Sequence, residues 1–252
     1  MRSRPAPDWN RLGTVLIDAG LASGALGLLS LGRNRRQAAK LVGLGGLLGL
    51  AGVALPAPVR RVRGAPVLLD IFLPECEFRE FHETRVNASP ERIYEAVLGV
   101  TAGEIRLFQT LTWLRSPRLP GGSLRPATIL NAPADRPILD VATSWEFCKL
   151  VEAPDIEIVV GMAVIRPKGT PPISTPTDFV TSRPGYALAA MNFRIEPGGP
   201  GWCRLTTETR VNATDALSRL RFAAYWRLIY PGSAFLRVQW LRAIRRRAEE
   251  RS

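Results

Sequence analysis

Residues 78–97 read FREFHETRVNASPERIYEAV, and they hold a strand, a helix start and a helix in direct succession. Through residues 78–88 the side chains alternate with period two, which is typical of a β-strand whose two faces meet different surroundings. Ser89 is a good N-cap and Pro90 suits the first helical position, so a helix is expected to begin here. The stretch therefore predicts a strand that feeds directly into a helix.

The hexapeptide ETRVNA in this stretch, residues 83–88, occurs again at residues 208–213, where a second helical pattern follows it. Between the two copies, a capping-box pattern at 101–104 predicts a short helix to about residue 115. Four further strands are expected at 143–153, 155–165, 185–197 and 201–213. A long helix is expected over 214–230, interrupted at Pro231 and resuming over 233–250.

Three segments resemble the START-like superfamily, also called SRPBCC after its polyketide cyclase, coenzyme-Q-binding and pollen-allergen branches. They are VNASPERIYEAV (86–97), FCKLVEAPDIEIVVG (147–161) and the closing block 206–249, which resembles an uncharacterised bacterial group. The resemblance covers residues 78–249. It implies an α+β helix-grip fold, in which a curved antiparallel sheet wraps a long C-terminal helix. It also implies that the first and last strands are antiparallel neighbours, with Val86 and Val211 in the core and crossed Glu/Arg pairs between the repeats on the outer face. Coincidence is the alternative explanation of the repeat.

The N-terminal fifth differs from the rest in composition. Residues 12–32 and 38–56 are rich in Leu and Gly, and as helices they would span roughly 31 and 28 Å, close to the hydrocarbon thickness of a bilayer. Glycines four apart, at 20 and 24 and at 45 and 49, would let two helices approach closely. We expect a membrane hairpin at 1–56, a linker at 57–77 and the helix-grip domain at 78–252. Asp18 and Lys40 favour the alternative, a hairpin of a soluble protein.

The charge and cysteine content restrict the partners and the location. The net charge is +12, but only three of the 34 cationic residues are lysines, as expected of a GC-rich bacterial genome, so no nucleic-acid partner is expected. The three cysteines have no CxxC spacing and favour reduced thiols in the cytoplasm. Arginines before and after the hairpin favour both of its ends in the cytoplasm. We expect a protein of the bacterial inner membrane with its domain facing the cytoplasm, or otherwise a cytoplasmic one.

The resemblance implies a cavity between the sheet and the last helix that holds an apolar ligand. Its expected lining is aromatic or apolar: Trp145, Phe147, Met191, Phe193, Phe222, Tyr225, Trp226 and Ile229. A stripe of this kind also suits an ordinary core. Trp and Tyr favour a ligand because a buried indole or phenol needs a hydrogen-bond partner.

His82 is a weak candidate for a catalytic base, with Glu80 and Thr84 as its polar neighbours on the same face of the strand. A structural role for this histidine is the alternative. A single histidine excludes His-rich metal sites, and no metal or cofactor is expected. The chain also lacks a nucleophile elbow and a Gly-rich phosphate loop.

Together these features predict a membrane-associated binding or carrier protein for a hydrophobic small molecule or lipid. A cyclase or dehydratase on the same fold is the first alternative, and it requires a polar pair in the cavity. The second is a structural module that binds a partner and fills its cavity with its own side chains.

Overall fold

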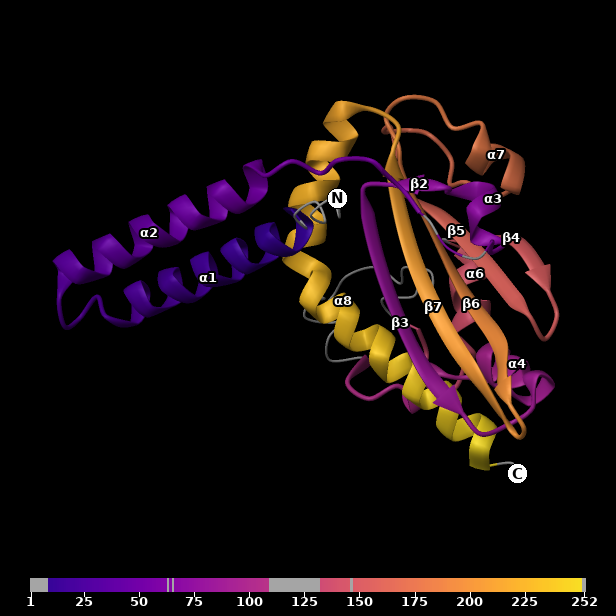
Figure 1. Ribbon diagram of the computed structural model, residues 1–252. Helices are drawn as coiled ribbons and strands as arrows, with labels where there is room; N and C mark the ends of the chain where they lie inside the picture. The colour runs from indigo at the N-terminus through magenta and orange to yellow at the C-terminus, as the bar shows by residue number, and fades with distance from the viewer. Residues whose placement is uncertain (1–8, 63, 65, 109–131, 146, 251–252) are drawn as a thin grey trace, which may run out of the picture. The chain divides into compact units, whose positions relative to one another are not determined.

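The computed structural model describes residues 9–62, 64, 66–108, 132–145 and 147–250 (Figure 1). Its elements, in chain order, are α1 (Trp9–Leu29), α2 (Arg35–Ala54), β1 (Arg60–Arg61), α3 (Leu69–Phe72), β2 (Glu75–Cys76), β3 (Phe78–Val86), α4 (Pro90–Gly99), the 3₁₀ helix η1 (Ala102–Glu104), α6 (Ile138–Trp145), β4 (Cys148–Ala153), β5 (Glu157–Ile165), α7 (Pro176–Val180), β6 (Ala187–Gly199), β7 (Trp202–Ala213) and α8 (Ala216–Glu250). Contacts group them into two compact units.

The first unit, the hairpin unit, contains Met1–Pro58 and Arg219–Pro231. Asn34 caps α2, because its side chain accepts hydrogen bonds from the N–H groups of Arg36 and Gln37, each at 3.1 Å. The helices touch at glycines. A Cβ atom at Gly20 would lie 2.7 Å from the carbonyl oxygen of Gly45, so no larger residue fits without a backbone shift. The predicted helical hairpin and its close glycine contact are confirmed.

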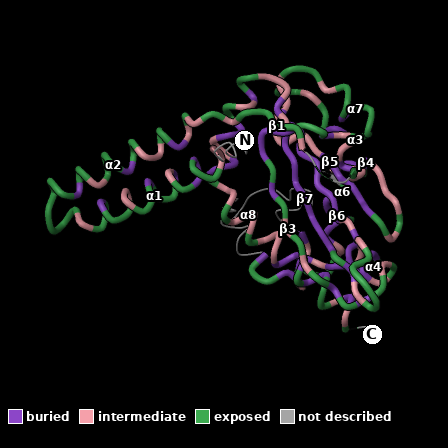
Figure 2. Tube along the Cα trace, in the orientation of Figure 1, coloured by how far each residue is buried: buried purple, intermediate pink, exposed green. Residues whose placement is uncertain are grey.

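The second unit, the sheet unit, contains Val59–Ser218 and Gly232–Ser252. Its five strands are all antiparallel and lie in the order β3-β7-β6-β5-β4. One face of the sheet, here called the inner face, packs against α4, α6 and residues 236–248 of α8 in a core that includes Val86, Phe193 and Ile244. β6 and β7 are buried along most of their length (Figure 2). The predicted helix-grip class, preceded by a helical hairpin, is confirmed.

β3 and β7, which contain the two ETRVNA copies, are antiparallel neighbours as predicted, but the copies do not face each other. The register places Phe81 opposite Glu208 and Glu83 opposite Thr206. The predicted Glu/Arg pairing between the repeats is therefore wrong. Glu208 pairs with Arg79, 2.6 Å away, and Glu83 lies 3.7 Å from Arg204, and both arginines stand outside the hexapeptides. Val86 and Val211 are buried, as expected.

The opposite face, here called the outer face, is covered by residues 59–77, which were predicted to be a linker. β1 pairs with β2, and the backbone N–H groups of Leu68 and Leu69 donate to the buried carboxylate of Glu157 on β5, at 3.0 and 3.3 Å. Leu69 and Leu73 pack with Val159 in a second hydrophobic cluster. This segment is therefore part of the sheet unit.

Three local predictions differ from the structure. Residues 143–145, predicted as strand, end helix α6, because a short stretch such as Thr-Ser-Trp fits either state until its neighbours are known. α8 continues through Pro231, because a proline removes one backbone hydrogen bond and can bend a helix without ending it. Of the short helix predicted to end near residue 115, the described part holds η1 and a bend and turn at 105–107, and residues 109–115 lie outside it.

Candidate functional site

Glu80 and His82 form an oriented pair on the inner face of β3. His82 Nε2 lies 2.9 Å from Glu80 Oε1, and the hydroxyl of Ser233 on α8 donates to Glu80 Oε2 at 3.1 Å. The Glu80 side chain is 1% exposed, whereas the His82 side chain is 20% exposed. The carboxylate is thus enclosed and holds two partners, and the imidazole keeps a partly open edge.

The surroundings of the pair follow from the strand register. His82 lies opposite Thr207, and Thr207 lies opposite Phe193, so the three side chains form one row across β3, β7 and β6. Glu80 begins the next row, which continues through Thr209 to Met191. Above the apolar ends of these rows lies α8. Trp240 packs on Phe193 with ring centroids 5.0 Å apart. The inner face therefore combines a polar end on β3 and β7 with an apolar end on β6.

Arg237 brings a cation to the same face. Its guanidinium contacts the Met191 sulfur and lies 5.3 Å from the centroid of the Trp240 ring, a cation–π distance. The contact places a positive charge beside apolar surface, which suits a ligand with an acidic or carbonyl group.

The geometry permits acid–base chemistry but not a Ser–His–acid relay. Ser233 donates to Glu80 and not to His82, so the histidine does not activate the serine. With Glu80 ionised, His82 donates through Nε2–H, and Nδ1 is the ring atom left to accept a proton. A histidine that acts as a general base needs a second group to orient its ring, and Glu80 is in position to do this for His82.

Trp240 adds a donor that sequence reasoning missed. Its side chain is 3% exposed, and within the described residues its indole Nε1 has no hydrogen-bond partner. Leaving a buried donor unsatisfied costs about 1–3 kcal/mol. The signal in the sequence was weak, because Trp240 stands in an arginine-rich helix end. Trp240 reaches the inner face because α8 packs against the sheet there, with Trp240 on Phe193.

The predicted lining residues divide between the two units. Phe147, Met191 and Phe193 belong to the inner-face core or pack against it. The other four described residues, Phe222, Tyr225, Trp226 and Ile229, fall in the segment of α8 that groups with the hairpin unit. The side chain of Trp145 lies outside the described part. Whether these residues line one cavity stays a prediction.

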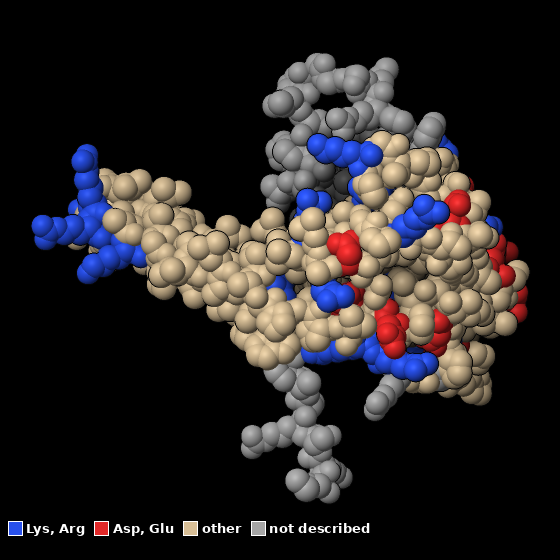
Figure 3. Space-filling view, turned by 90° about the horizontal axis from the view of Figure 1, so that it is seen from above, with Lys and Arg blue, Asp and Glu red and all other residues tan. Residues whose placement is uncertain are grey.

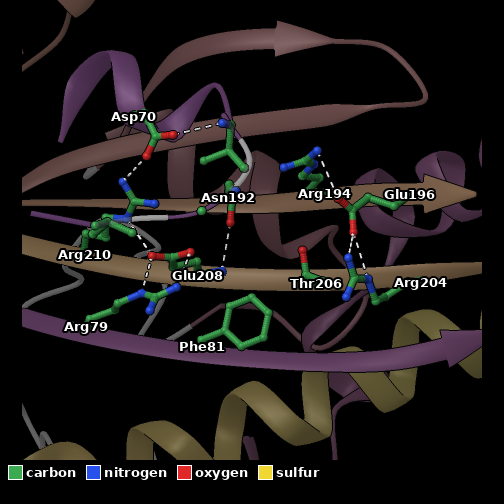
Figure 4. A pocket seen from close by; sticks show the side chains of 13 residues that line it. Asp70, Arg79, Phe81, Asn192, Arg194, Glu196, Arg204, Thr206, Glu208 and Arg210 are labelled. Carbon is green, nitrogen blue, oxygen red and sulfur yellow. Dashed lines mark hydrogen bonds and ion pairs between the residues drawn. The ribbon is translucent and has the colours of Figure 1, made fainter. Parts of the chain in front are cut away.

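A cavity of about 170 Å³ lies on the outer face, beneath residues 59–77 (Figure 4). Its charged lining consists of four arginines and three carboxylates: Arg79, Arg194, Arg204, Arg210, Asp70, Glu196 and Glu208. Figure 4 shows Arg79 and Arg210 turned toward Glu208, and Arg194 and Arg204 turned toward Glu196. Every arginine of this lining has a carboxylate partner, and two of them, Arg210 and Arg194, also bond to residues of the segment 59–77.

Arg210 is the centre of this network. Its Nη1 donates to Asp70 Oδ1 at 2.6 Å and to the Leu73 carbonyl at 2.8 Å, and both acceptors lie in the covering segment. Burial opposes ionisation of Asp70 and Glu208, but hydrogen bonds outweigh it and hold the pKa of both carboxyls below the usual range. For Asp70 the donors are the Val67 N–H and Arg210, and for Glu208 they are Arg79 and Arg210.

The cysteines and the acidic side chains of the described part of the chain are the groups to compare with the pair on β3. Cys76, Cys148 and Cys203 are buried and not disulfide-bonded, and burial raises the pKa of Cys76 to about 11. Over the described ranges, no three His, Cys, Asp or Glu side chains stand together as a metal site. A hollow of about 300 Å³ beside α7, lined by residues such as Pro172, Asp178 and Tyr186, holds no comparable pair of reactive groups.

Comparison with known proteins identifies no family, since no protein-family model and no curated protein matches the chain. Among solved structures, the di-domain ARO/CYC protein StfQ of the steffimycin biosynthetic pathway is 12% identical, with a TM-score of 0.31. The match covers 69% of this chain and 51% of StfQ, so the chain spans about half of that protein. A hypothetical protein from Helicobacter pylori is 9% identical, with 74% and 96% covered and a TM-score of 0.33. Human STARD10 is 11% identical, with 67% and 63% covered and a TM-score of 0.26. These similarities are too low to transfer a function.

Proposed function

We propose that the sheet unit binds a hydrophobic small molecule or lipid against its inner face, and that the N-terminal hairpin anchors the protein in a membrane. The observation that carries the binding proposal is the buried indole N–H of Trp240, which has no partner among the described residues. A carbonyl or carboxylate oxygen of a ligand would satisfy it. The apolar body of the ligand would rest on Met191 and Phe193.

The proposed ligand is therefore amphipathic, with one acceptor group on a mainly apolar body. The cation of Arg237 beside Trp240 favours an acceptor with negative charge or a strong dipole. Fatty acids and aromatic or polyketide ketones have this chemistry. The START-like resemblance of the sequence, including its bacterial character, agrees with such a ligand and remains part of the proposal.

Membrane anchoring is supported by the surface of the hairpin. α1 and α2 are long and apolar enough to cross a bilayer, by length and composition. Most of their large side chains point outward, with Leu21, Leu47 and Leu50 exposed by 58%, 69% and 71%. A soluble hairpin would bury such a surface, and a bilayer covers it. We place the anchor in the bacterial inner membrane with the sheet unit on the cytoplasmic side.

The test is native mass spectrometry of the full chain, purified in detergent, followed by solvent extraction of bound lipids and small molecules. We expect an apolar compound to co-purify, and Trp240→Phe to retain much less of it, because phenylalanine keeps the packing but lacks the N–H. Trp202→Phe, in a partly buried tryptophan of β7, is the matched control and should retain the compound. A chain that purifies empty, or equal retention by the two variants, would contradict the proposal. An empty chain would favour the structural module with a filled cavity.

A second candidate is an enzyme of the cyclase or dehydratase type, favoured by the Glu80–His82 pair. In this function His82 Nδ1 would accept a proton from the ligand while Glu80 holds the ring. His82→Gln should then abolish conversion of the extracted compound while retaining its binding. If His82→Gln converts it at the rate of the unmodified chain, the protein is a carrier and His82 is structural.

A further inference from the structure

Arg227 lies inside the hairpin unit and holds the open end of the hairpin. Its side chain is completely buried. Its Nη1 donates to the carbonyl oxygens of Gly52 and Val53 at 2.9 and 3.0 Å, and its Nη2 donates to those of Leu55 and Pro56 at 3.0 and 3.1 Å. These carbonyls belong to the last turn of α2 and the residues after it, which have no further helical partners. One guanidinium thus closes the C-terminal end of α2.

The same side chain lies against the start of α1. Arg227 Nη2 is 3.3 Å from Asn10 Oδ1, and a Cβ atom at Gly13 would stand 2.5 Å from Arg227 Nε. Only glycine leaves room for the arginine at that position. Residues 219–231 of α8 therefore pack at the end of the hairpin where α1 begins and α2 ends.

The length of the hairpin fixes where that end would lie in a membrane. α1 has 21 residues and α2 has 20, or roughly 30 Å each at about 1.5 Å per residue, which matches the hydrocarbon thickness. Arg33, Arg35 and Arg36 are exposed at the turn, and Figure 3 shows cationic side chains gathered at that end of the hairpin, with an uncharged surface along its visible length. With the turn at one bilayer surface, Arg227 lies at the other.

The segment 219–231 has the composition of an interfacial helix. It contains three arginines and no acidic residue. Its aromatic rings form a stack, with Phe222 5.8 Å from Trp226 and Trp226 5.6 Å from Tyr230. Phe222 and Trp226 are buried, whereas Tyr230 is partly exposed, and tyrosine favours the boundary between lipid and water. Leu220 and Leu228, eight positions apart and so on one face, are 55% and 54% exposed.

We propose that residues 219–231 form a third membrane element, which lies in the bilayer interface at the open end of the hairpin. Leu220 and Leu228 enter the acyl boundary, and Arg221 meets the phosphates of anionic lipids. Arg227 fixes this helix to α2, so that the anchor has three parts instead of two. The inference rests on the proposed membrane hairpin.

Spin labels on single introduced cysteines test it in the full chain, reconstituted in vesicles of phosphatidylcholine and phosphatidylglycerol. The test sites are Leu220→Cys and Leu228→Cys. Leu47→Cys on α2 is the reference for the bilayer interior, and Lys168→Cys on an exposed loop is the reference for water. The three native thiols are buried, so the unsubstituted chain should take up no label. Collision rates with oxygen and with a water-soluble nickel chelate are measured at each site.

We expect the oxygen-to-nickel ratio at residues 220 and 228 to lie between those of the two references. If residue 47 is in lipid while 220 and 228 match 168, the third element is overturned and the hairpin anchor stands. If residue 47 also matches 168, the anchor fails and this inference fails with it. Labels at 220 and 228 that are shielded from both probes would mean a protein partner on this face, and would also overturn the inference.

A second variant separates the role of Arg227 from loss of folding. In Arg227→Met the ratio at residue 228 should shift toward that of residue 168, while residue 47 keeps its value. Arg227→Lys, which retains the charge but not the several donors, should shift it partway. An unchanged ratio at residue 228 in Arg227→Met would contradict the fixing role.

Discussion

Replacing Arg210 with methionine should remove the strongest link between the sheet and residues 59–77. Arg210 is 1% exposed at its side chain and binds Glu208 and Asp70, each at 2.6 Å. Methionine fills a similar volume without charge. Removing one partner of a buried ion pair costs about 3–5 kcal/mol, because the other charge stays buried and uncompensated.

The contacts of Arg210 narrow the expected loss of stability within this range. Arg210 makes three hydrogen bonds, to Glu208, Asp70 and the Leu73 carbonyl, and bonds to charged groups are worth about 1.5–3 kcal/mol each. Asp70 is 35% exposed, so water would replace part of its bond. Glu208 is 8% exposed but keeps Arg79. We therefore expect a loss of about 4 kcal/mol, a large part of the roughly 5–15 kcal/mol of a typical domain.

The effect should depend on pH in a defined direction. Asp70 and Glu208 have folded-state pKa values below their ordinary ones, so their contribution to stability is present above pH about 4 and is lost as the pH falls through the folded values. The difference between the unmodified chain and Arg210→Met should therefore be largest near neutral pH and shrink toward pH 3.

Urea unfolding of the full chain in detergent, followed by tryptophan fluorescence, measures both the loss of stability and its dependence on pH. Arg204→Met is the matched control, since Arg204 lies on the same face of β7 and pairs with Glu196 but is 51% exposed. We expect it to cost at most about 1 kcal/mol. Adding Asp70→Asn and Glu208→Gln to Arg210→Met should recover part of the loss, because no buried charge then stays uncompensated. A cost for Arg210→Met no larger than that for Arg204→Met would refute the reasoning.

Three further outcomes are expected. Gly20→Ala should lower the thermal stability of the hairpin in detergent, measured by circular dichroism, because the added Cβ meets backbone atoms of α2. Gly24→Ala, where the added Cβ meets open space, should leave the stability equal or higher. A change of the same sign in both variants would contradict the packing. The three buried thiols should not react with a chromogenic disulfide reagent at pH 8 until urea unfolds the chain, and rapid reaction of the folded chain would show that they are accessible. Asp215 accepts from the N–H and the hydroxyl of Ser218 and from the N–H groups of Gly185 and Leu217, and these bonds lower its pKa to about 2. Asp215→Ala should therefore unfold at lower urea than the unmodified chain above pH about 4, and the gap should close as the pH falls toward 2; a gap independent of pH would count against the cap.

The strand order could be predicted in part because local signals agreed with the final pairing. The alternation through residues 78–88 and the cap at Ser89 both match the observed β3 and α4. The register could not be predicted, since two identical hexapeptides suggest that they face each other. Burial of Phe78 and Val86 fixes which face of β3 points inward, whereas the observed register, with Phe78 opposite Val211 and Val86 opposite Cys203, offsets the copies.

The candidate site could be predicted from the sequence even less completely than the register of the strands. The neighbours Glu80 and His82 share a face by parity alone, and the sequence identified them. Ser233 and Trp240 reach the inner face because the part of α8 that follows Pro231 packs against β3 and β6. Long-range packing, which decides such cases, leaves no periodic signal in one sequence.

Some of the arginines that give the chain its high net charge are buried and serve as hydrogen-bond donors inside the protein. The net charge of +12 counts Arg210 and Arg227, although both side chains are buried. They use a planar group with several donors to hold backbone carbonyls and carboxylates, a task for which lysine is poorly suited.

The arginines at the basic end of α8 also bond to carboxylates and carbonyls of the same chain. Arg245 pairs with Glu249, Arg246 donates to the Glu104 carbonyl, and Arg247 pairs with the Glu104 carboxylate. Nucleic-acid affinity depends on cations that can replace counterions at phosphates, and arginines already bonded to carboxylates and carbonyls of the same chain have less of their charge available for it. The formal charge therefore overstates the cationic surface. The expectation of no nucleic-acid partner, which remains a prediction, gains a physical reason beyond codon usage.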